Sequence, residues 1–90
     1  MTTSRTALGT QKYWKDLKNL IQKQNHKCSL TGDVISFESD IDLDHIIPKT
    51  RRGKNELSNV RWVTRQANRL KNNLTDSELK ELCKKILQTI

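Results

Sequence analysis

The 90-residue sequence lacks the features that define several other classes of protein. No apolar run approaches the roughly 20 residues that a membrane-spanning helix needs, so no membrane association is expected. The first ten residues, MTTSRTALGT, contain no apolar core of a secretory signal, and we therefore expect an intracellular protein. Aromatic residues make up only 4% of the chain, which argues against an RNA-binding domain that stacks bases on its surface.

Cysteine is also scarce. The two cysteines, Cys28 and Cys83, are far apart and form no CxxC pair. In an intracellular chain we expect both to be reduced thiols. No structural zinc is expected, because the only further soft ligands are His26 and His45.

Positive charge is abundant and unevenly distributed. The net charge is +7, and residues 49–71 carry eight basic residues against the single acid Glu56. Residues 33–44 show the reverse pattern, with five acids and no base. A basic block indicates a polyanionic partner such as nucleic acid, and the neighbouring acidic cluster indicates a bound cation. Two separate solvated faces are the alternative explanation.

Apolar periodicity predicts one α+β domain over residues 11–90, preceded by a flexible tail over residues 1–10. The last helix should begin at the capping box Thr75-Asp76-Ser77-Glu78. The expected elements are a helix over 11–26, a strand over 41–46, a loop over 49–58, a strand over 59–63, a helix over 65–73 capped by Thr64, and the last helix.

The last helix carries an apolar stripe that we expect to cover the core. A dimer face is the alternative use of the same stripe. Its members are Leu79, Leu82, Cys83, Ile86, Leu87 and Ile90. Trp62, in the second strand, is expected in the core rather than in a nucleic-acid groove.

The residues best suited to chemistry are the adjacent pair Asp44-His45. Histidine accepts a proton near neutral pH, and aspartate is a hard ligand for Mg²⁺ or Mn²⁺. Neighbouring residues of a regular strand point to opposite faces. Both side chains should therefore reach one site only if the strand bends near Pro48. By itself the pair is equally compatible with ordinary polar residues at a strand end.

Asparagines follow the pair along the chain. Asn68 and Asn72 lie four residues apart and share a face of the predicted helix, where an amide oxygen can ligate a hard metal. Asn59 opens the second predicted strand. Asn73 is the expected C-cap of the helix.

Taken together, residues 42–73, DLDHIIPKTRRGKNELSNVRWVTRQANRLKNN, resemble the HNH endonuclease family. The resemblance rests on an ordered set: Asp44, His45, Pro48, Gly53, Asn59, Asn68 and Lys71. Upstream, residues 26–32 resemble the lead-in of many members, although Thr31 stands where a second zinc-binding cysteine would fall. The small format is similar to intron-linked or phage-borne homing-type members, which places the protein in a bacterial or phage-infected cell.

This resemblance implies a ββα-metal fold with flanking helices, its core motif over residues 41–73. It implies that His45 is the general base, that Asn59 orients His45 by hydrogen bonds, and that Asp44 and Asn68 hold one Mg²⁺ or Mn²⁺ ion. Asp42 and Asn72 are further candidates for the same site. The reaction would be hydrolysis of DNA phosphodiester bonds to leave 5′-phosphate and 3′-hydroxyl ends.

Double-stranded DNA is the expected partner, since phosphate contacts would supply most of the affinity. The expected contacts are Lys49, Arg51, Arg52, Lys54, Arg61, Arg65, Arg69 and Lys71. A monomer would nick one strand, and a homodimer would cut both. The alternatives are a catalytically inactive DNA-binding module on the same scaffold, an RNA-processing domain and a toxin-like nuclease.

Overall fold

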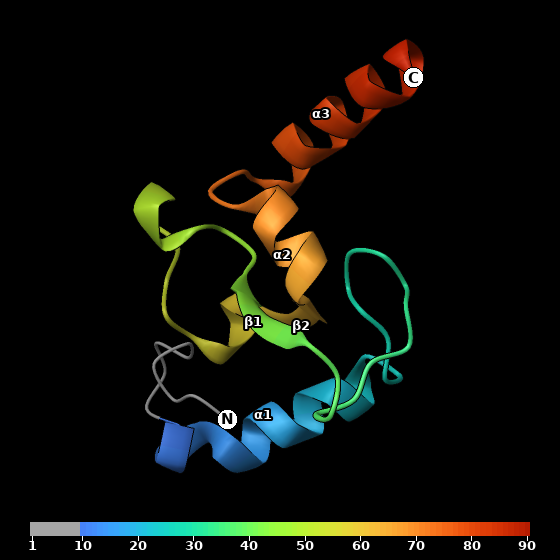
Figure 1. The fold of residues 1–90 in the computed structure, drawn as a ribbon. Coiled ribbons are helices and arrows are strands. Elements are labelled where there is room, and N and C mark those ends of the chain that lie inside the picture. Colours follow the sequence, from blue (N-terminus) through green and yellow to red (C-terminus); the bar gives the residue numbers. More distant parts are fainter. Residues whose placement is uncertain (1–9) are drawn as a thin grey trace.

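The structure, a computed structural model, describes residues 10–90, with side chains from Tyr13 onward (Figure 1). The elements are α1 (Thr10–Lys23), β1 (Ile41–His45), the short 3₁₀ turns η2 (Lys49–Arg51) and η3 (Leu57–Asn59), β2 (Val60–Thr64), α2 (Arg65–Lys71) and α3 (Asp76–Thr89). The tail predicted over residues 1–10 lies outside the described residues, except that Thr10 is the first residue of α1.

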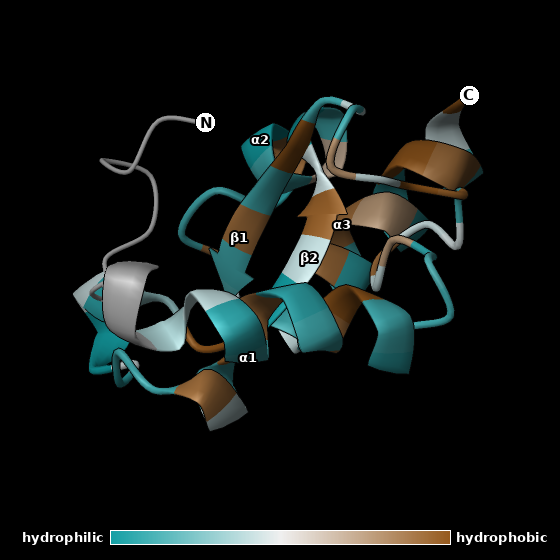
Figure 2. Cartoon of the chain, turned by 90° about the horizontal axis from the view of Figure 1, so that it is seen from below, coloured by the Kyte–Doolittle hydropathy of each residue, from teal (hydrophilic) through white to brown (hydrophobic). Residues whose placement is uncertain are grey.

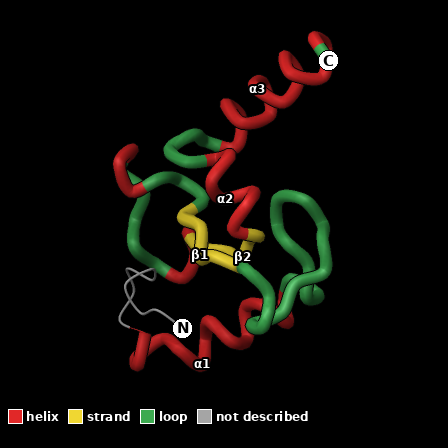
Figure 3. Tube along the Cα trace, in the orientation of Figure 1, coloured by secondary structure: helices red, strands yellow, loops and turns green. Residues whose placement is uncertain are grey.

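The strands β1 and β2 form a two-stranded antiparallel ribbon, which confirms the predicted α+β class. Their register places Leu43 opposite Trp62 and Asp44 opposite Arg61. α1 lies across one side of the ribbon and α2 lies on the other side, next to the loops that flank it (Figures 1 and 3). The ribbon therefore has a helix on each side, and the order of β1, β2 and α2 is that of a ββα motif.

The core lies between α1 and the ribbon. Trp62 is 3% exposed, as predicted, and its indole Nε1 donates to the carbonyl oxygen of Leu17 at 2.8 Å. Figure 2 shows apolar positions alternating with polar ones along α1, which is why one side of this helix can be buried while the other faces solvent. The buried residues are Leu17, Ile21, Cys28, Ile35, Ile41, Leu43, Val60, Trp62, Val63 and Ala67.

The free edge of β2 is covered by the chain that leaves α1. The side chain of Gln24 accepts from the Trp62 N–H at 2.8 Å and donates to the Trp62 carbonyl oxygen at 2.9 Å. The Cys28 thiol accepts from the Thr64 N–H at 3.3 Å. Burial raises the pKa of this thiol, but the hydrogen bonds it accepts outweigh burial and leave the pKa below its ordinary value. Backbone groups that an edge strand leaves unpaired are thus satisfied within the chain.

The loop from β1 to β2 folds back tightly at Gly53. Its N–H donates to the Pro48 carbonyl oxygen at 2.9 Å, and a Cβ at this position would overlap the carbonyl oxygen of Ile47. Only glycine allows the backbone to approach so closely. The basic loop is therefore a closed turn rather than an extended strand connection.

The last helix does not cover the core, and that prediction is wrong. The capping box forms as expected, with Thr75 accepting from the Glu78 N–H, but α3 contains no buried residue and projects away from the ribbon (Figure 1). Leu82 and Ile86 are 36% and 39% exposed. α1 and the loops already occupy the apolar side of so small a ribbon, so the stripe has no core left to cover. None of the described helices is long and apolar enough to cross a membrane.

We expect Gln24→Ala to destabilise the fold, because it leaves the N–H and carbonyl of Trp62 without their side-chain partner. The cost should be about 1–3 kcal/mol in the free energy of unfolding. Chemical denaturation followed by tryptophan fluorescence measures it. Gln22→Ala is the matched control, because Gln22 is an exposed glutamine in the last turn of α1, two residues before Gln24. Equal stability of the two variants would contradict the role given to Gln24.

Candidate active site

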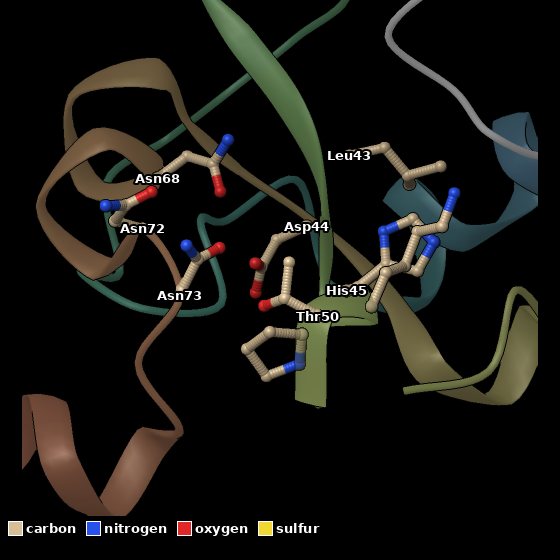
Figure 4. Close-up of a pocket in the computed structure, with 9 residues that line it drawn as sticks. Leu43, Asp44, His45, Thr50, Asn68, Asn72 and Asn73 are labelled. Atoms are coloured by element: carbon tan, nitrogen blue, oxygen red, sulfur yellow. The ribbon is translucent and has the colours of Figure 1, made fainter. Parts of the chain in front are cut away.

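A pocket opens where β1 ends, between the loop that follows and α2 (Figure 4). Its volume is about 190 Å³. The lining residues are Leu43, Asp44, His45, Pro48, Lys49, Thr50, Asn68, Asn72 and Asn73. The tertiary structure thus brings together four of the six residues predicted for catalysis and metal binding; Asp42 and Asn59 lie outside the lining.

Asp44 is the most constrained charge in the pocket. It is 4% exposed, and each carboxylate oxygen accepts from a cation. Oδ1 accepts from Lys71 Nζ at 3.0 Å, and Oδ2 accepts from Arg61 Nε at 2.9 Å. Arg61 reaches it because the register places the two residues opposite each other. A buried carboxylate needs such partners, since an unpaired charge in the interior is strongly disfavoured.

Lys71 and Arg61 therefore serve the interior of the protein. The Lys71 side chain is fully buried and donates to the His45 carbonyl oxygen at 2.9 Å as well as to Asp44. Arg61 is 13% exposed and binds Asp44 and Asp76. Lys71 is fully buried, which contradicts its predicted contact with DNA phosphates, and the guanidinium of Arg61 is occupied by Asp44 and Asp76 instead of facing solvent. Sequence could not reveal this, since burial of a lysine depends on tertiary packing.

Asp42 controls the orientation of Asn68. Its Oδ2 accepts from Asn68 Nδ2 at 3.1 Å, and its Oδ1 accepts from Arg65 Nε at 3.2 Å. A carboxylate can only accept, so the Asn68 amide must present nitrogen to Asp42. Figure 4 shows the amide oxygen of Asn68 pointing toward Asp44 and the nitrogen pointing away. Asp42 thus supports the site from outside the pocket.

The bend predicted near Pro48 is present: β1 ends at His45, and the chain bends at Ile46 and Ile47 directly after it. His45 pairs with Val60 in regular register, and the side chains of Asp44 and His45 leave the strand toward different sides in Figure 4. Both nevertheless border one pocket, because the cavity opens around the end of the strand and is closed by Pro48 and Thr50. The bend after the strand and the loop that follows it together bring the two side chains to one site.

Asn55, and not Asn59, contacts the imidazole. His45 Nε2 lies 3.0 Å from Asn55 Oδ1. Asn59 instead binds backbone: its Oδ1 accepts from the Ile47 N–H at 2.9 Å, and its Nδ2 donates to the carbonyl oxygens of Lys54 and Ile47 at 2.8 and 3.1 Å. The predicted Asn59–His45 hydrogen bond is therefore wrong. Asn55 was missed because nothing in a polar loop marks which residue faces the histidine.

Two asparagines end α2 at the pocket. Asn72, with φ of 48°, is the C-cap residue, a position predicted for Asn73. Its backbone N–H donates to the Asn68 carbonyl oxygen at 2.9 Å. Asparagine tolerates a positive φ better than most residues. Asn73 lines the pocket and its side chain points toward Asp44 in Figure 4, so it joins the site in a way that the sequence did not indicate.

The remaining predicted DNA contacts fall into two groups. Arg51 pairs with Glu78, and Arg65 pairs with Asp40 and Asp42. The other four side chains are exposed and make no ion pair with any described residue; they are Lys49, Arg52, Lys54 and Arg69. Three of them lie on the loop beside the pocket, and Lys49 lines it.

Asp76, the first residue of α3, belongs to the same electrostatic network. Hydrogen bonds from Arg61 are the main cause that holds the pKa of the Asp76 carboxyl below its ordinary value, against an opposing effect of burial. Burial lowers the pKa of Arg61, but hydrogen bonds to Asp76 and the charges of Asp44 and Asp76 outweigh it and raise the pKa. Both groups therefore remain charged at neutral pH.

The pocket offers oxygen donors rather than a cluster of acids. Across residues 10–90, no group of three or more His, Cys, Asp and Glu side chains is placed to hold a metal ion. The available donors are the Asp44 carboxylate and the amide oxygens of Asn68 and Asn73, which Figure 4 shows on one side of β1. Hard oxygen ligands completed by water suit Mg²⁺ and Mn²⁺. The donor set fits such an ion, and it does not fit zinc.

Comparison with known proteins agrees with this arrangement. No curated protein matches the chain. The family model of the HNH endonucleases matches residues 28–77, which span the ribbon, the pocket, α2 and the first two residues of α3. Membership indicates nuclease activity on a nucleic-acid substrate. The chain belongs to the HNH endonuclease family.

Proposed function

We propose that this protein is a divalent-metal-dependent DNA endonuclease with His45 as its general base. One observation carries the proposal: the pocket at the end of β1 is bordered by a buried carboxylate, an oriented amide oxygen and an imidazole, from Asp44, Asn68 and His45. These are the groups that hydrolysis of a phosphodiester needs, namely oxygen ligands for a cation and a base for water.

Asp44 and Asn68 would hold the ion. Lys71 and Arg61 each donate a hydrogen bond to one carboxylate oxygen of Asp44. Each oxygen keeps a second lone pair, which can bind a metal ion. Asp42 keeps the oxygen of Asn68 directed to the pocket. A bound Mg²⁺ or Mn²⁺ would neutralise charge on the phosphate and on the departing 3′-oxygen. Asn72 and Asn73 are further amide donors beside it.

His45 would take the proton of the attacking water. Because Asn55 Oδ1 is an acceptor, the contact at 3.0 Å is a hydrogen bond only when Nε2 carries the proton. Nδ1 then retains its lone pair and is the basic nitrogen. Asn55 thus selects the tautomer and fixes the ring plane. Attack by the resulting hydroxide breaks the P–O3′ bond and leaves a 5′-phosphate and a 3′-hydroxyl.

Asn59 would act on the loop rather than on the histidine. Its three hydrogen bonds to Ile47 and Lys54 hold together the two ends of the turn that carries Asn55. Gly53 permits the same turn to close. Asn59 therefore acts on His45 indirectly: it fixes the backbone of the loop that carries Asn55, and Asn55 contacts the imidazole.

The DNA would approach over the basic loop. Lys49, Arg52 and Lys54 are exposed and unpaired among the described residues, and they lie beside the pocket, so phosphates bound by them would place a neighbouring phosphate near His45. Arg69, exposed on α2, extends the positive surface.

A catalytically inactive DNA-binding module is the second candidate, and one observation favours it. Both oxygens of Asp44 already accept from cations, so the carboxylate is neutralised without any metal. Such a module would keep DNA binding but bind no divalent ion in the pocket. The metal requirement of cleavage distinguishes the two functions.

Cleavage of plasmid DNA by the wild-type protein should disappear in excess EDTA and return when Mg²⁺ or Mn²⁺ is added in excess over the chelator. A gel assay for nicked and linear products measures this, and sequencing of the ends should find 5′-phosphates. Activity that persists in EDTA would exclude the metal mechanism. Binding without cleavage under every metal condition would favour the inactive module.

His45→Ala should reduce the cleavage rate by about 100-fold or more, which is the usual contribution of a general base. Affinity for DNA, measured by fluorescence anisotropy in EDTA, should stay within about twofold, because the exposed cations are unchanged. His26→Asn is the matched control: His26 is the other histidine, it is exposed, and asparagine accommodates its φ of 55°. Full activity of His45→Ala would remove the assigned base.

Asp42→Asn should weaken Mn²⁺ binding about tenfold or more, the usual effect of losing a group that orients a metal ligand. An amide at position 42 can donate, so Asn68 is free to turn its nitrogen into the pocket. Asp40→Asn is the control, since Asp40 pairs with the same Arg65 but is 89% exposed, and among the described residues it makes no hydrogen bond with Asn68. Calorimetric titration measures both, and equal affinities would contradict the orienting role.

A further inference from the structure

Arg61, a largely buried arginine, joins the first turn of α3 to the carboxylate of the pocket. Arg61 donates from Nε to Asp44 Oδ2 at 2.9 Å, and its two terminal nitrogens donate to both oxygens of Asp76 at 2.9 and 2.6 Å. All three donor groups of the guanidinium are thereby occupied. A planar guanidinium held at both edges has little freedom to rotate. The position of the Asp44 carboxylate is therefore coupled to Asp76.

The same contacts balance the charge around the pocket. Asp44 and Asp76 carry two negative charges, and Lys71 and Arg61 carry two positive charges. Without the carboxylate of Asp76, the group would have a net charge of +1 next to the oxygens that hold a divalent cation. Such an excess opposes metal binding, and it does so strongly because Lys71 and Asp44 are buried and poorly screened.

The cap at the start of α3 positions Asp76 for its contact with Arg61. The Thr75–Glu78 capping box sets the first turn of α3, and Asp76 is the first helical residue, just after the N-cap. A second ion pair joins Glu78 of the same turn to Arg51 of the basic loop. The rest of α3 buries no residue, so these polar contacts account for how its first turn is held against the site.

We propose that Asp76 is a positioning residue of the nuclease site, which holds and neutralises Arg61 so that Asp44 is kept in place for a divalent cation. The proposal rests on the function proposed above. Asp76 lies outside the pocket lining and touches neither Asp44 nor the cavity. It acts through Arg61, and its loss should appear first as weaker metal binding rather than as weaker DNA binding.

The decisive measurement is calorimetric titration of Mn²⁺ into the wild type and Asp76→Asn, in the absence of DNA. We expect the dissociation constant of Asp76→Asn for Mn²⁺ to be about tenfold or more above that of the wild type, because an uncompensated positive charge near the site repels the cation. Asp76→Glu, which keeps the charge, should recover most of the affinity. Glu81→Gln is the matched control, because it removes one acid from the same helix outside the network.

Cleavage kinetics provide a second readout that a merely structural role would not produce. The cleavage rate of Asp76→Asn should be low at limiting Mn²⁺ and should approach the wild-type rate as Mn²⁺ is raised. The dissociation constant for DNA in EDTA should stay within about twofold, since the exposed phosphate-binding side chains are untouched. In an Arg61→Met background, Asp76→Asn should change the Mn²⁺ affinity by less than about twofold, because the residue through which Asp76 acts is gone.

Two results separate failure of this inference from failure of the proposed function. Wild-type affinity for Mn²⁺ in folded Asp76→Asn would overturn the positioning role and leave the nuclease intact. A wild-type protein that neither binds Mn²⁺ nor cleaves DNA would overturn the nuclease function and this inference with it. Circular dichroism verifies the fold, and Asp76→Ser, which removes the same carboxylate, supplies the measurement if Asp76→Asn is unfolded.

Discussion

The buried carboxylate of Asp44 is the interaction on which the rest of the site depends. Lys71 and Arg61 bind its two oxygens, and these two cations come from α2 and β2, so one carboxylate joins all three elements of the ββα motif. A small domain has little apolar area to bury. Charge pairing at this point helps to hold α2 against the ribbon. Removing Asp44 would leave the charge of Lys71 buried without a counter-ion, which would destabilise the fold and remove a ligand of the proposed metal site together.

Around that carboxylate, the polar groups of the site are arranged in successive layers. Asp42 holds the Asn68 amide, Asn55 holds the imidazole, and Asn59 closes the loop that carries Asn55. Each of these contacts orients a side chain of the site and takes no direct part in bond making or breaking. Because acceptors and donors are fixed by type, a carboxylate facing one side of an amide forces oxygen to the other side. Such preorganisation is what a hydrolytic site needs before a substrate arrives.

The basic residues show how tertiary structure divides a charge pattern that looks uniform in sequence. Eight bases follow one another over residues 49–71. In the fold, Lys71 and Arg61 pair with the buried carboxylate of Asp44, whereas Lys49, Arg52 and Lys54 remain exposed on the loop. A block of positive charge can thus serve two purposes at once. Part of it pairs with the carboxylates of the site, and part of it remains exposed to solvent.

The sequence by itself determined the α+β class and the order of the elements, because apolar periodicity is a local property. Its resemblance to the HNH family singled out Asp44, His45 and Asn68, and the fold brings these three residues to one pocket. Only the tertiary structure decided that Lys71 is internal, that Asn55 faces the imidazole and that α3 stands away from the core. These outcomes depend on which groups meet across the fold. An amphipathic stripe shows that a helix has an apolar side, and the packing of the other elements decides whether anything covers it.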